Sequence, residues 1–237
     1  MLQQTTVKTV IPYFHRFMAR FPTIGDLAAA AEEDVYQLWQ GLGYYTRARS
    51  LHKTAQMIVN EFGGRFPDTR EGVLKLKGIG AYTVASFMAL AFNKSETVID
   101  GNVMRIIARL YHLTAPLDEI ADTIRQKAAL LTSKENAADY ASAIMDLGAV
   151  VCTPKNPQCL LCPWQEYCRS RTASDLEQIP VRRRLEKKEK QGIVLVTENG
   201  HGELFIRKRT EKGLLLGLYE FPWNDKGLIG EGAVDTG

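Results

Sequence analysis

The 237-residue chain has the composition of an ordinary globular protein, with 45% hydrophobic and 24% charged residues. These proportions exclude an intrinsically disordered or collagen-like chain, and no apolar run approaches the ~20 residues that a membrane-spanning helix needs. The net charge of +3 says little about partners, because residues 181–190 alone carry +4 and leave −1 for the rest (+3 minus +4). The N-terminus lacks the basic and apolar regions of a secretory signal, so the sequence predicts a cytoplasmic protein.

Apolar residues recur with helical spacing from Val7 to about residue 170, with short breaks at Gly, Pro and Asn and no strand-like alternation. Asp26, Thr46 and Asp100 each stand where they can cap the N-terminus of a helix. The helices expected after these caps end near residues 40, 62 and 112, respectively. A further helix follows a short helical turn at about residue 70 and ends near 92. Two more helices are expected over about 117–131 and 135–150. The sequence therefore predicts an all-α domain over residues 1–171.

The character of the chain changes after residue 171. Residues 172–191 form a charged linker, and two β-rich runs, 193–197 and 203–207, follow on either side of Asn199-Gly200. This arrangement predicts a β-hairpin. Because one hairpin buries too little apolar surface to fold as a domain of its own, we expect residues 192–237 to be the incomplete beginning of a second domain.

All the cysteines lie in one short segment with the pattern C-x6-C-x2-C-x5-C: Cys152, Cys159, Cys162 and Cys168. Four thiolates in one loop can bind a zinc ion or the four corners of a 4Fe-4S cluster, and a reducing compartment disfavours disulfides. Structural zinc sites usually contain two C-x2-C pairs, whereas this loop has one close pair and two looser arms. The spacing alone leaves zinc and iron-sulfur as alternatives.

A turn with two glycines, Lys77-Gly78-Ile79-Gly80, separates the short turn at about residue 70 from the helix that ends near 92. Two glycines allow a tight hairpin whose backbone N–H groups, at a helix N-terminus, can hold an anion such as a DNA phosphate. An isolated G-x-G is more often an ordinary turn between helices. Both interpretations stay open on the sequence alone.

Asp100, in the segment Val98-Ile99-Asp100-Gly101-Asn102, stands at the start of a predicted helix. Its simplest role is that of an N-cap. A carboxylate at a helix N-terminus is also favoured in its anionic form, so it suits the stabilisation of a positively charged sugar better than proton donation.

Two polar and aromatic segments, MLQQT at residues 1–5 and GLGYYTRAR at residues 41–49, form a further group. Gln, Leu and Tyr side chains on loops can wedge into a base stack and fill the gap left by an extruded nucleotide, and Arg47 and Arg49 could reach phosphates. Taken singly, such residues are usually part of a core or a turn.

The segments MLQQT, GLGYYTRAR, LKGIGAYT, VIDGNVMR and MDLGAVVCTPKNPQCLLCPWQEYC follow one another in an order and spacing that closely resembles the adenine DNA glycosylases of the MutY type. These enzymes belong to the helix-hairpin-helix base-excision superfamily. The resemblance covers residues 1 to about 168. It implies an all-α helix-hairpin-helix glycosylase core with a 4Fe-4S cluster on the cysteine loop, and it identifies residues 192–237 as similar to the beginning of an α/β Nudix-like domain.

The resemblance also implies roles for individual residues. Asp100 would be the catalytic carboxylate, assisted by Tyr82. Bifunctional glycosylase/lyases have a lysine where Tyr82 stands, and a phenol cannot form a Schiff base, so a monofunctional hydrolase is implied. Val7 and Asp146 would contact the extruded adenine. DNA would be held by Gln3, Gln4, Thr5, Leu42, Tyr44, Tyr45, Arg47, Lys77, Gly78 and Gly80, with Lys155, Arg169 and Arg171 near phosphates.

The implied partner is double-stranded DNA with adenine opposite 8-oxoguanine or guanine, bound by a monomer. In the family the first segment reads Glu-Val-Met-Leu-Gln-Gln-Thr, and that glutamate donates a proton to the departing adenine; this chain starts at the methionine. A general acid is typically worth ~10²–10⁴-fold in rate. We therefore expect impaired base excision from this polypeptide, with a non-catalytic DNA-binding remnant as the alternative.

Overall fold

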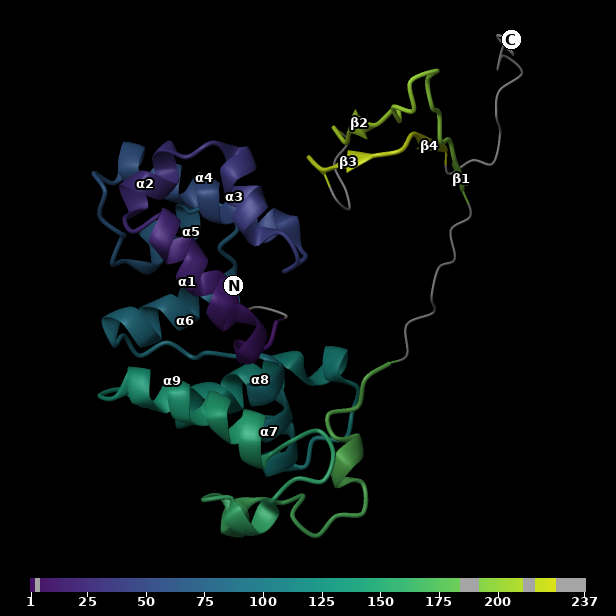
Figure 1. The fold of residues 1–237 in the computed structure, drawn as a ribbon. Coiled ribbons are helices and arrows are strands. Elements are labelled where there is room, and N and C mark those ends of the chain that lie inside the picture. Colours follow the sequence, from purple (N-terminus) through teal and green to yellow (C-terminus); the bar gives the residue numbers. More distant parts are fainter. Residues whose placement is uncertain (3–4, 184–191, 211–215, 225–237) are drawn as a thin grey trace. The chain divides into compact units, whose positions relative to one another are not determined.

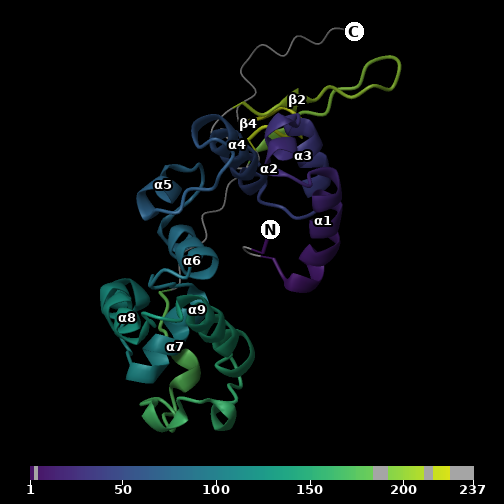
Figure 2. The same ribbon diagram turned by 90° about the vertical axis from the view of Figure 1, so that its left-hand side faces the viewer.

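The structure, a computed structural model, describes residues 1–2, 5–183, 192–210 and 216–224. The chain divides into two units (Figures 1 and 2). The first contains Met1–Pro22, Ala30–Ser50 and Leu185–Gly237, and the second contains Thr23–Ala29 and Leu51–Arg184. None of the described helices is both long enough and apolar enough to cross a membrane. The boundaries that the sequence places at residues 171 and 191 stay predictions.

The first unit is built on α1 (Val7–Arg20), α3 (Glu32–Trp39) and the first turns of α4 (Tyr45–Glu61). Its core is aromatic. Phe17 of α1 packs edge-on against Trp39 at the end of α3, with 6.4 Å between the ring centroids. This contact fixes the start of the loop that carries residues 41–44.

The prediction of one helix between residues 26 and 40 is wrong. The segment forms two helices, α2 (Ile24–Ala29) and α3. Asp26 lies in the first turn of α2, where its Oδ2 accepts a hydrogen bond from the Thr23 backbone N–H at 3.0 Å. Acidic residues 32–34 then occupy the first turn of α3, where the positive end of the helix dipole favours a new start.

The second unit contains most of the helices: α2, most of α4, α5 (Arg70–Lys75), α6 (Ala81–Phe92), α7 (Gly101–Tyr111), α8 (Leu117–Leu131) and α9 (Ala137–Asp146). The helices predicted near residues 47–62, 101–112 and 117–131 are confirmed, although Thr46 lies inside α4 instead of capping it. The last predicted helix ends as α-helix at Asp146 and continues as a π-helical turn over Leu147–Val151.

Helix α7 forms the centre of this unit. Its apolar side chains are buried with those of α8 and α9; the buried residues of this cluster are Val103, Ile106, Ile107, Ala108, Ile120, Ile124, Ala128, Ile144 and Ile179. Helices α6 and α9 lie side by side in both ribbon views (Figures 1 and 2). They pack through small residues such as Ala85 and Ala141. Small side chains let two helices approach closely, so the start of α6 is held rigidly against α9.

The strands are short and belong to the first unit. β1 (Ile193–Val194) pairs antiparallel with β4 (Trp223–Asn224), and β2 (Arg207–Lys208) pairs antiparallel with β3 (Tyr219–Glu220). The predicted hairpin is confirmed at its turn, where the Phe205 N–H donates to the Thr197 carbonyl at 2.9 Å. Its outer ends differ from the prediction, because they pair with residues 219–224 instead of with each other.

Candidate functional site

Asp100 caps helix α7, as the sequence predicts. Its Oδ1 accepts a hydrogen bond from the Val103 backbone N–H at 2.7 Å. The carboxylate is half-buried and is held at the N-terminus of an 11-residue helix. The orientation of this negative charge is therefore fixed by the backbone of α7.

The end of α9 touches the start of α7. A Cβ atom added to Gly148 would lie only 2.5 Å from the Cβ of Asn102, so the absence of a side chain at Gly148 permits this close approach. Asp146, the last residue of α9, is exposed and lies two residues before Gly148. The structure thus brings the segments that carry Asp100 and Asp146 into contact.

Arg105 ties this contact to the cysteine loop. Its Nη2 donates to the Gly148 carbonyl at 2.8 Å and to the Asn102 Oδ1 at 2.9 Å, and its Nε donates to the Cys152 carbonyl at 2.7 Å. Burial lowers the pKa of this guanidinium from its usual value. One buried cation therefore connects the start of α7, the end of α9 and the first cysteine.

Arg109, one turn further along α7, holds the next part of the loop. It is only 1% exposed. Nη1 donates to the Thr153 carbonyl at 2.6 Å and Nη2 to the Pro154 carbonyl at 2.9 Å, and Nε donates to the Ile179 carbonyl at 3.0 Å. Nη1 also lies 3.5 Å from the Cys152 Sγ. Sequence reasoning assigned no role to either arginine, although two arginines four positions apart on an apolar helix were a usable signal.

The four cysteines line one cavity together with Arg109 and Arg171. In the part of the chain that the structure describes, no three His, Cys, Asp or Glu side chains lie close enough together to hold a single metal ion. A tetrahedral zinc site with Zn–S bonds of about 2.3 Å needs sulfurs about 3.8 Å apart. Four thiols around one cavity form a donor set that suits either a zinc ion or an iron-sulfur cluster with four corners. Burial raises the pKa of the Cys162 and Cys168 thiols, so ligand formation requires a metal that displaces their protons.

The glycine-containing turn forms an open hairpin before α6. Gly78 has a φ of +77°, which an L-residue with a side chain rarely adopts. Gly80 is the N-cap of α6, and a Cβ added there would meet no atom within 4 Å. Neither its backbone nor its neighbours therefore demand glycine at Gly80, whereas a closely approaching ligand would. Thr54 Oγ1 braces the turn by donating to the Lys77 carbonyl at 2.8 Å.

Tyr82 lies in the first turn of α6 and is 38% exposed. Its helix packs through Ala85 against Val98 and α9. The second unit therefore holds the hairpin, Tyr82, Asp100 and the cysteine loop in one connected packing arrangement.

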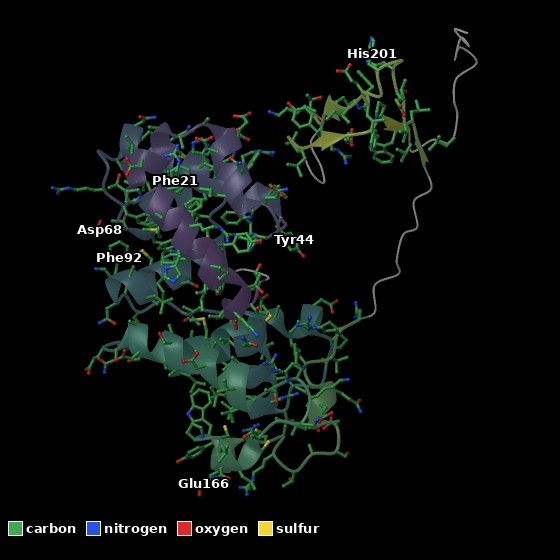
Figure 3. The ribbon with its side chains drawn as sticks, viewed as in Figure 1. Phe21, Tyr44, Asp68, Phe92, Glu166 and His201 are labelled. Carbon is green, nitrogen blue, oxygen red and sulfur yellow. The ribbon has the colours of Figure 1, made fainter. Side chains whose placement is uncertain are left out.

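The DNA contacts predicted within residues 1–49 belong to the first unit. Tyr44 is 62% exposed and has a φ of +48°, whereas Leu42 is 6% exposed and lies in the core. Figure 3 shows Tyr44 at the end of its loop. Exposure makes Tyr44 the better candidate for insertion between bases. Tyr45 instead packs edge-on against Tyr36, with 5.8 Å between ring centroids.

Arg47 stabilises the loop around Tyr44. It donates to the carbonyls of Met1 at 3.2 Å and Leu42 at 3.3 Å, and its guanidinium lies over the rings of Trp39 and Tyr44. Burial lowers the pKa of Arg47. The structure thus gives Arg47 a role in shaping the loop.

The other residues expected at the DNA or at the base are placed as follows. The Nε of Arg49 donates a hydrogen bond to the Tyr36 Oη of the same unit, at 2.9 Å. Val7, the first residue of α1, is exposed, and Thr5 is half-buried just before it. Gln3 and Gln4 lie outside the described residues.

Comparison with known proteins decides the family. Residues 1–129 match the model of the HhH-GPD superfamily base excision DNA repair proteins. The chain belongs to this superfamily. Residues 152–168 match the iron-sulfur binding domain of endonuclease III, which confirms the predicted 4Fe-4S site over zinc.

Curated relatives of the HhH-GPD chain carry the name adenine DNA glycosylase. One from Buchnera aphidicola (strain Sg) is 38% identical over 228 residues, covering 94% of this chain and 65% of the relative. The human protein of that name is 41% identical over 184 residues, covering 76% of this chain and 33% of its own length. The chain thus spans less than two thirds of these relatives.

Two solved structures resemble the fold of the superfamily member. A thermostable thymine-DNA glycosylase matches with a TM-score of 0.64 and 27% identity, covering 72% of this chain and 79% of that one. A trapped endonuclease III-DNA covalent intermediate matches with a TM-score of 0.62 and 25% identity, covering 71% and 79%. The predicted helix-hairpin-helix glycosylase fold is confirmed.

Proposed function

We propose that this chain is a DNA glycosylase that removes adenine opposite 8-oxoguanine or guanine by hydrolysing the N-glycosidic bond. The observation that carries the proposal is the Asp100 carboxylate fixed at the start of α7, in a chain that is 38% identical to an adenine DNA glycosylase over almost its whole length. Double-stranded DNA is the partner, bound by a monomer.

Asp100 is the group that stabilises the sugar. Departure of a base leaves positive charge on the deoxyribose ring, and a carboxylate whose orientation is already fixed lowers the energy of that state without reorganising. The Val103 N–H that binds Oδ1 leaves the other carboxylate oxygen available for the sugar. Asp100 supplies charge, and proton donation must come from another group.

Tyr82 sets the reaction type. An amine at this position could attack the sugar carbon and form a Schiff base, which opens a route to strand cleavage, whereas a phenol cannot. With Tyr82 in the first turn of α6, water is the nucleophile, and the products are free adenine and an abasic site.

The hairpin and the loops hold the DNA. The open N-terminus of α6 at Gly78–Gly80 accepts a phosphate, and Lys77, which is exposed, adds a positive charge beside it. Tyr44 fills the space in the base stack that the extruded adenine leaves. The exocyclic amine of the extruded adenine donates to Asp146.

The cysteine loop also supports the contact with the DNA backbone. The cluster, when bound, orders residues 152–168, and this ordering presents Lys155, Arg169 and Arg171 to the DNA backbone. We assign it no chemical step. A brown protein whose visible absorption is lost in Cys159→Ser is the expected signature, and a colourless protein that contains zinc would contradict it.

A proton donor is also required, because neutral adenine is a poor leaving group. The family resemblance places this donor at a glutamate two positions before the methionine of MLQQT. A general acid of this kind typically contributes about 10²–10⁴-fold to the rate.

A single-turnover assay on matched duplexes tests the proposal. The chain should bind a duplex with adenine opposite 8-oxoguanine more tightly than one with adenine opposite thymine, and should release adenine from the former. Asp100→Asn should retain the binding and lower the release rate by about 10²–10³-fold.

Two results would contradict the assignment. One is release of a pyrimidine in place of adenine. The other is a covalent adduct trapped by borohydride, which would indicate a lyase. Selective binding with no release, even when a general acid is supplied, would favour the non-catalytic DNA-binding remnant.

A further inference from the structure

A groove lies on the second unit at the end of α6 that is remote from the hairpin. Its walls are the loop at residues 62–69, helix α5 and Phe92 at the C-terminus of α6. Asp68 and Phe92 appear close together on the same side of the unit in Figure 3. Its volume is about 660 Å³, and it is wide open to solvent.

The groove has an aromatic wall that is already formed. Phe66 stacks on Phe87, with 4.8 Å between ring centroids and 23° between planes, and lies 6.4 Å from the ring of Phe92. Gly72 keeps the loop close to α5, because a Cβ there would lie 2.7 Å from the Pro67 Cβ. A ligand would therefore find an apolar surface that needs little rearrangement.

Four exposed charges of both signs surround this wall: Arg65, Asp68, Glu71 and Lys75. Among the described residues, none of the four forms an ion pair. The neighbouring Arg70, by contrast, is paired with Glu96. The groove therefore offers two cations and two carboxylates to a ligand.

We propose that this groove binds a short peptide segment of a partner protein, with one aromatic or large aliphatic side chain flanked by residues of opposite charge. The apolar side chain packs against Phe66 and Phe92. The flanking acid pairs with Arg65 or Lys75, and the flanking base pairs with Asp68 or Glu71.

Charge complementarity distinguishes a peptide from nucleic acid here. Asp68 and Glu71 would repel the phosphates of a single strand, whereas a peptide can present both signs. From Ala81 to Phe92, α6 rises by about 17 Å, so Phe92 and the hairpin are at opposite ends of one helix, whereas Lys75 on α5 lies two residues before Lys77 of the hairpin. A peptide and DNA can occupy the two ends together, and the proposal does not depend on the glycosylase reaction.

Four blocked tripeptides test the proposal, each with Phe in the centre and Glu or Lys on either side. The full chain, labelled with nitrogen-15, is titrated with each peptide up to about 5 mM, a range that detects even weak binding. At least one peptide of mixed charge should cause saturable shifts of the Gly72 and Phe92 amide signals. It should bind about fivefold more tightly than the two peptides of uniform charge. A peptide with Ala in the centre should lose the binding.

A charge-reversal variant provides the matched control. Arg65→Glu should weaken the mixed peptide and strengthen binding of the Lys-Phe-Lys peptide, while the affinity for a mispaired duplex stays unchanged. The far-UV spectrum checks that the variant folds, which is expected because the side chain is exposed. Absence of saturable shifts with all four peptides would overturn the proposal. So would displacement of the peptide by single-stranded oligothymidylate, or weaker duplex binding by the variant.

Discussion

The α7–cysteine-loop region and the strand region at residues 193–224 are held together in different ways. In the former, Arg105 and Arg109 donate to carbonyls that lie 43 to 70 positions away in the sequence. In the latter, the paired strands are two residues long, and many apolar side chains are exposed, among them Val196 and Phe205.

This difference shows where the chain fixes its geometry. A buried guanidinium donates several hydrogen bonds in fixed directions, and leaving its acceptors unsatisfied costs far more than the bonds themselves contribute. Several hydrogen bonds therefore fix the geometry of the α7 region around Asp100. The strand region has hydrogen-bonded turns but, within the described residues, little that covers its apolar side chains. We expect substitutions to be costly in the first region and nearly neutral in the second.

The largest effect is expected from Arg109→Met. Loss of the guanidinium leaves the carbonyls of Thr153, Pro154 and Ile179 without their donor, and the bond to Ile179 is buried, so the free energy of unfolding should fall by about 3–5 kcal/mol. Chemical denaturation followed by the helical far-UV signal measures the change, and visible absorption reports whether the cluster is retained.

Arg125→Met on α8 is the matched control, since that side chain is 63% exposed. It should change the stability by less than about 0.5 kcal/mol. Equal losses for both variants would mean that the buried arginine does not hold the loop.

A smaller loss is expected from Gly148→Ala. The new methyl group would collide with Asn102, so the end of α9 must move away from the start of α7, at a cost of about 1–3 kcal/mol. Gly80→Ala is the matched control, because its methyl group meets open space. The two variants separate packing from ligand approach: Gly80→Ala should keep the stability and weaken duplex binding, as measured by fluorescence anisotropy. Unchanged binding would remove the hairpin from the proposed DNA surface.

The sequence predicted this region unevenly. The cap at Asp100 and the helix at 117–131 follow from local signals, since a cap needs only the next turn and an amphipathic stripe needs only its own spacing. The roles of Arg105 and Arg109 could not be predicted in that way, because their acceptors are brought to them by the fold. Burying an arginine costs free energy unless acceptors satisfy its N–H groups, and only the three-dimensional contacts show which acceptors do so.

The same limit applies to the loops. GLGYYTRAR was interpreted as a group, yet the sequence alone does not show that Leu42 is buried while Tyr44 is exposed, or that Arg47 binds carbonyls of its own unit. The break between α2 and α3 was missed because the acidic residues 32–34 were not recognised as favouring the start of a new helix. In the strands, the Asn-Gly turn was predicted from the sequence. The pairing of residues 193–194 with 223–224 was not, because it is a long-range contact that local signals do not indicate.

Tyr140→Phe should raise the stability slightly. Among the described residues, the buried Tyr140 Oη has no hydrogen-bond partner, so its removal should add about 1 kcal/mol to the free energy of unfolding. Burial also raises the pKa of Tyr140 from its ordinary value of about 10 to about 12. Because the folded state disfavours the phenolate, the free energy of unfolding of the parent chain falls as the pH rises from about 10 to about 12. The variant has no phenol at this position, so its free energy of unfolding does not fall for this reason. The advantage of the variant, measured by denaturation at each pH, should therefore grow over that interval; a constant difference would contradict the assignment.

The smallest effect is expected in the strand region, from Phe205→Ser. Phe205 is 57% exposed, so its removal from the folded chain sacrifices little buried surface, and the stability should change by less than about 0.5 kcal/mol. Ile107→Ser on α7 is the counterpart, with a side chain that is 0% exposed, and it should cost about 3 kcal/mol or more because it leaves a cavity and buries a hydroxyl. Denaturation curves of the two variants compare the regions directly. If Phe205→Ser destabilised the chain as much as Ile107→Ser, the apolar strand residues would be packed against a surface of this chain, and the contrast between the regions would fail.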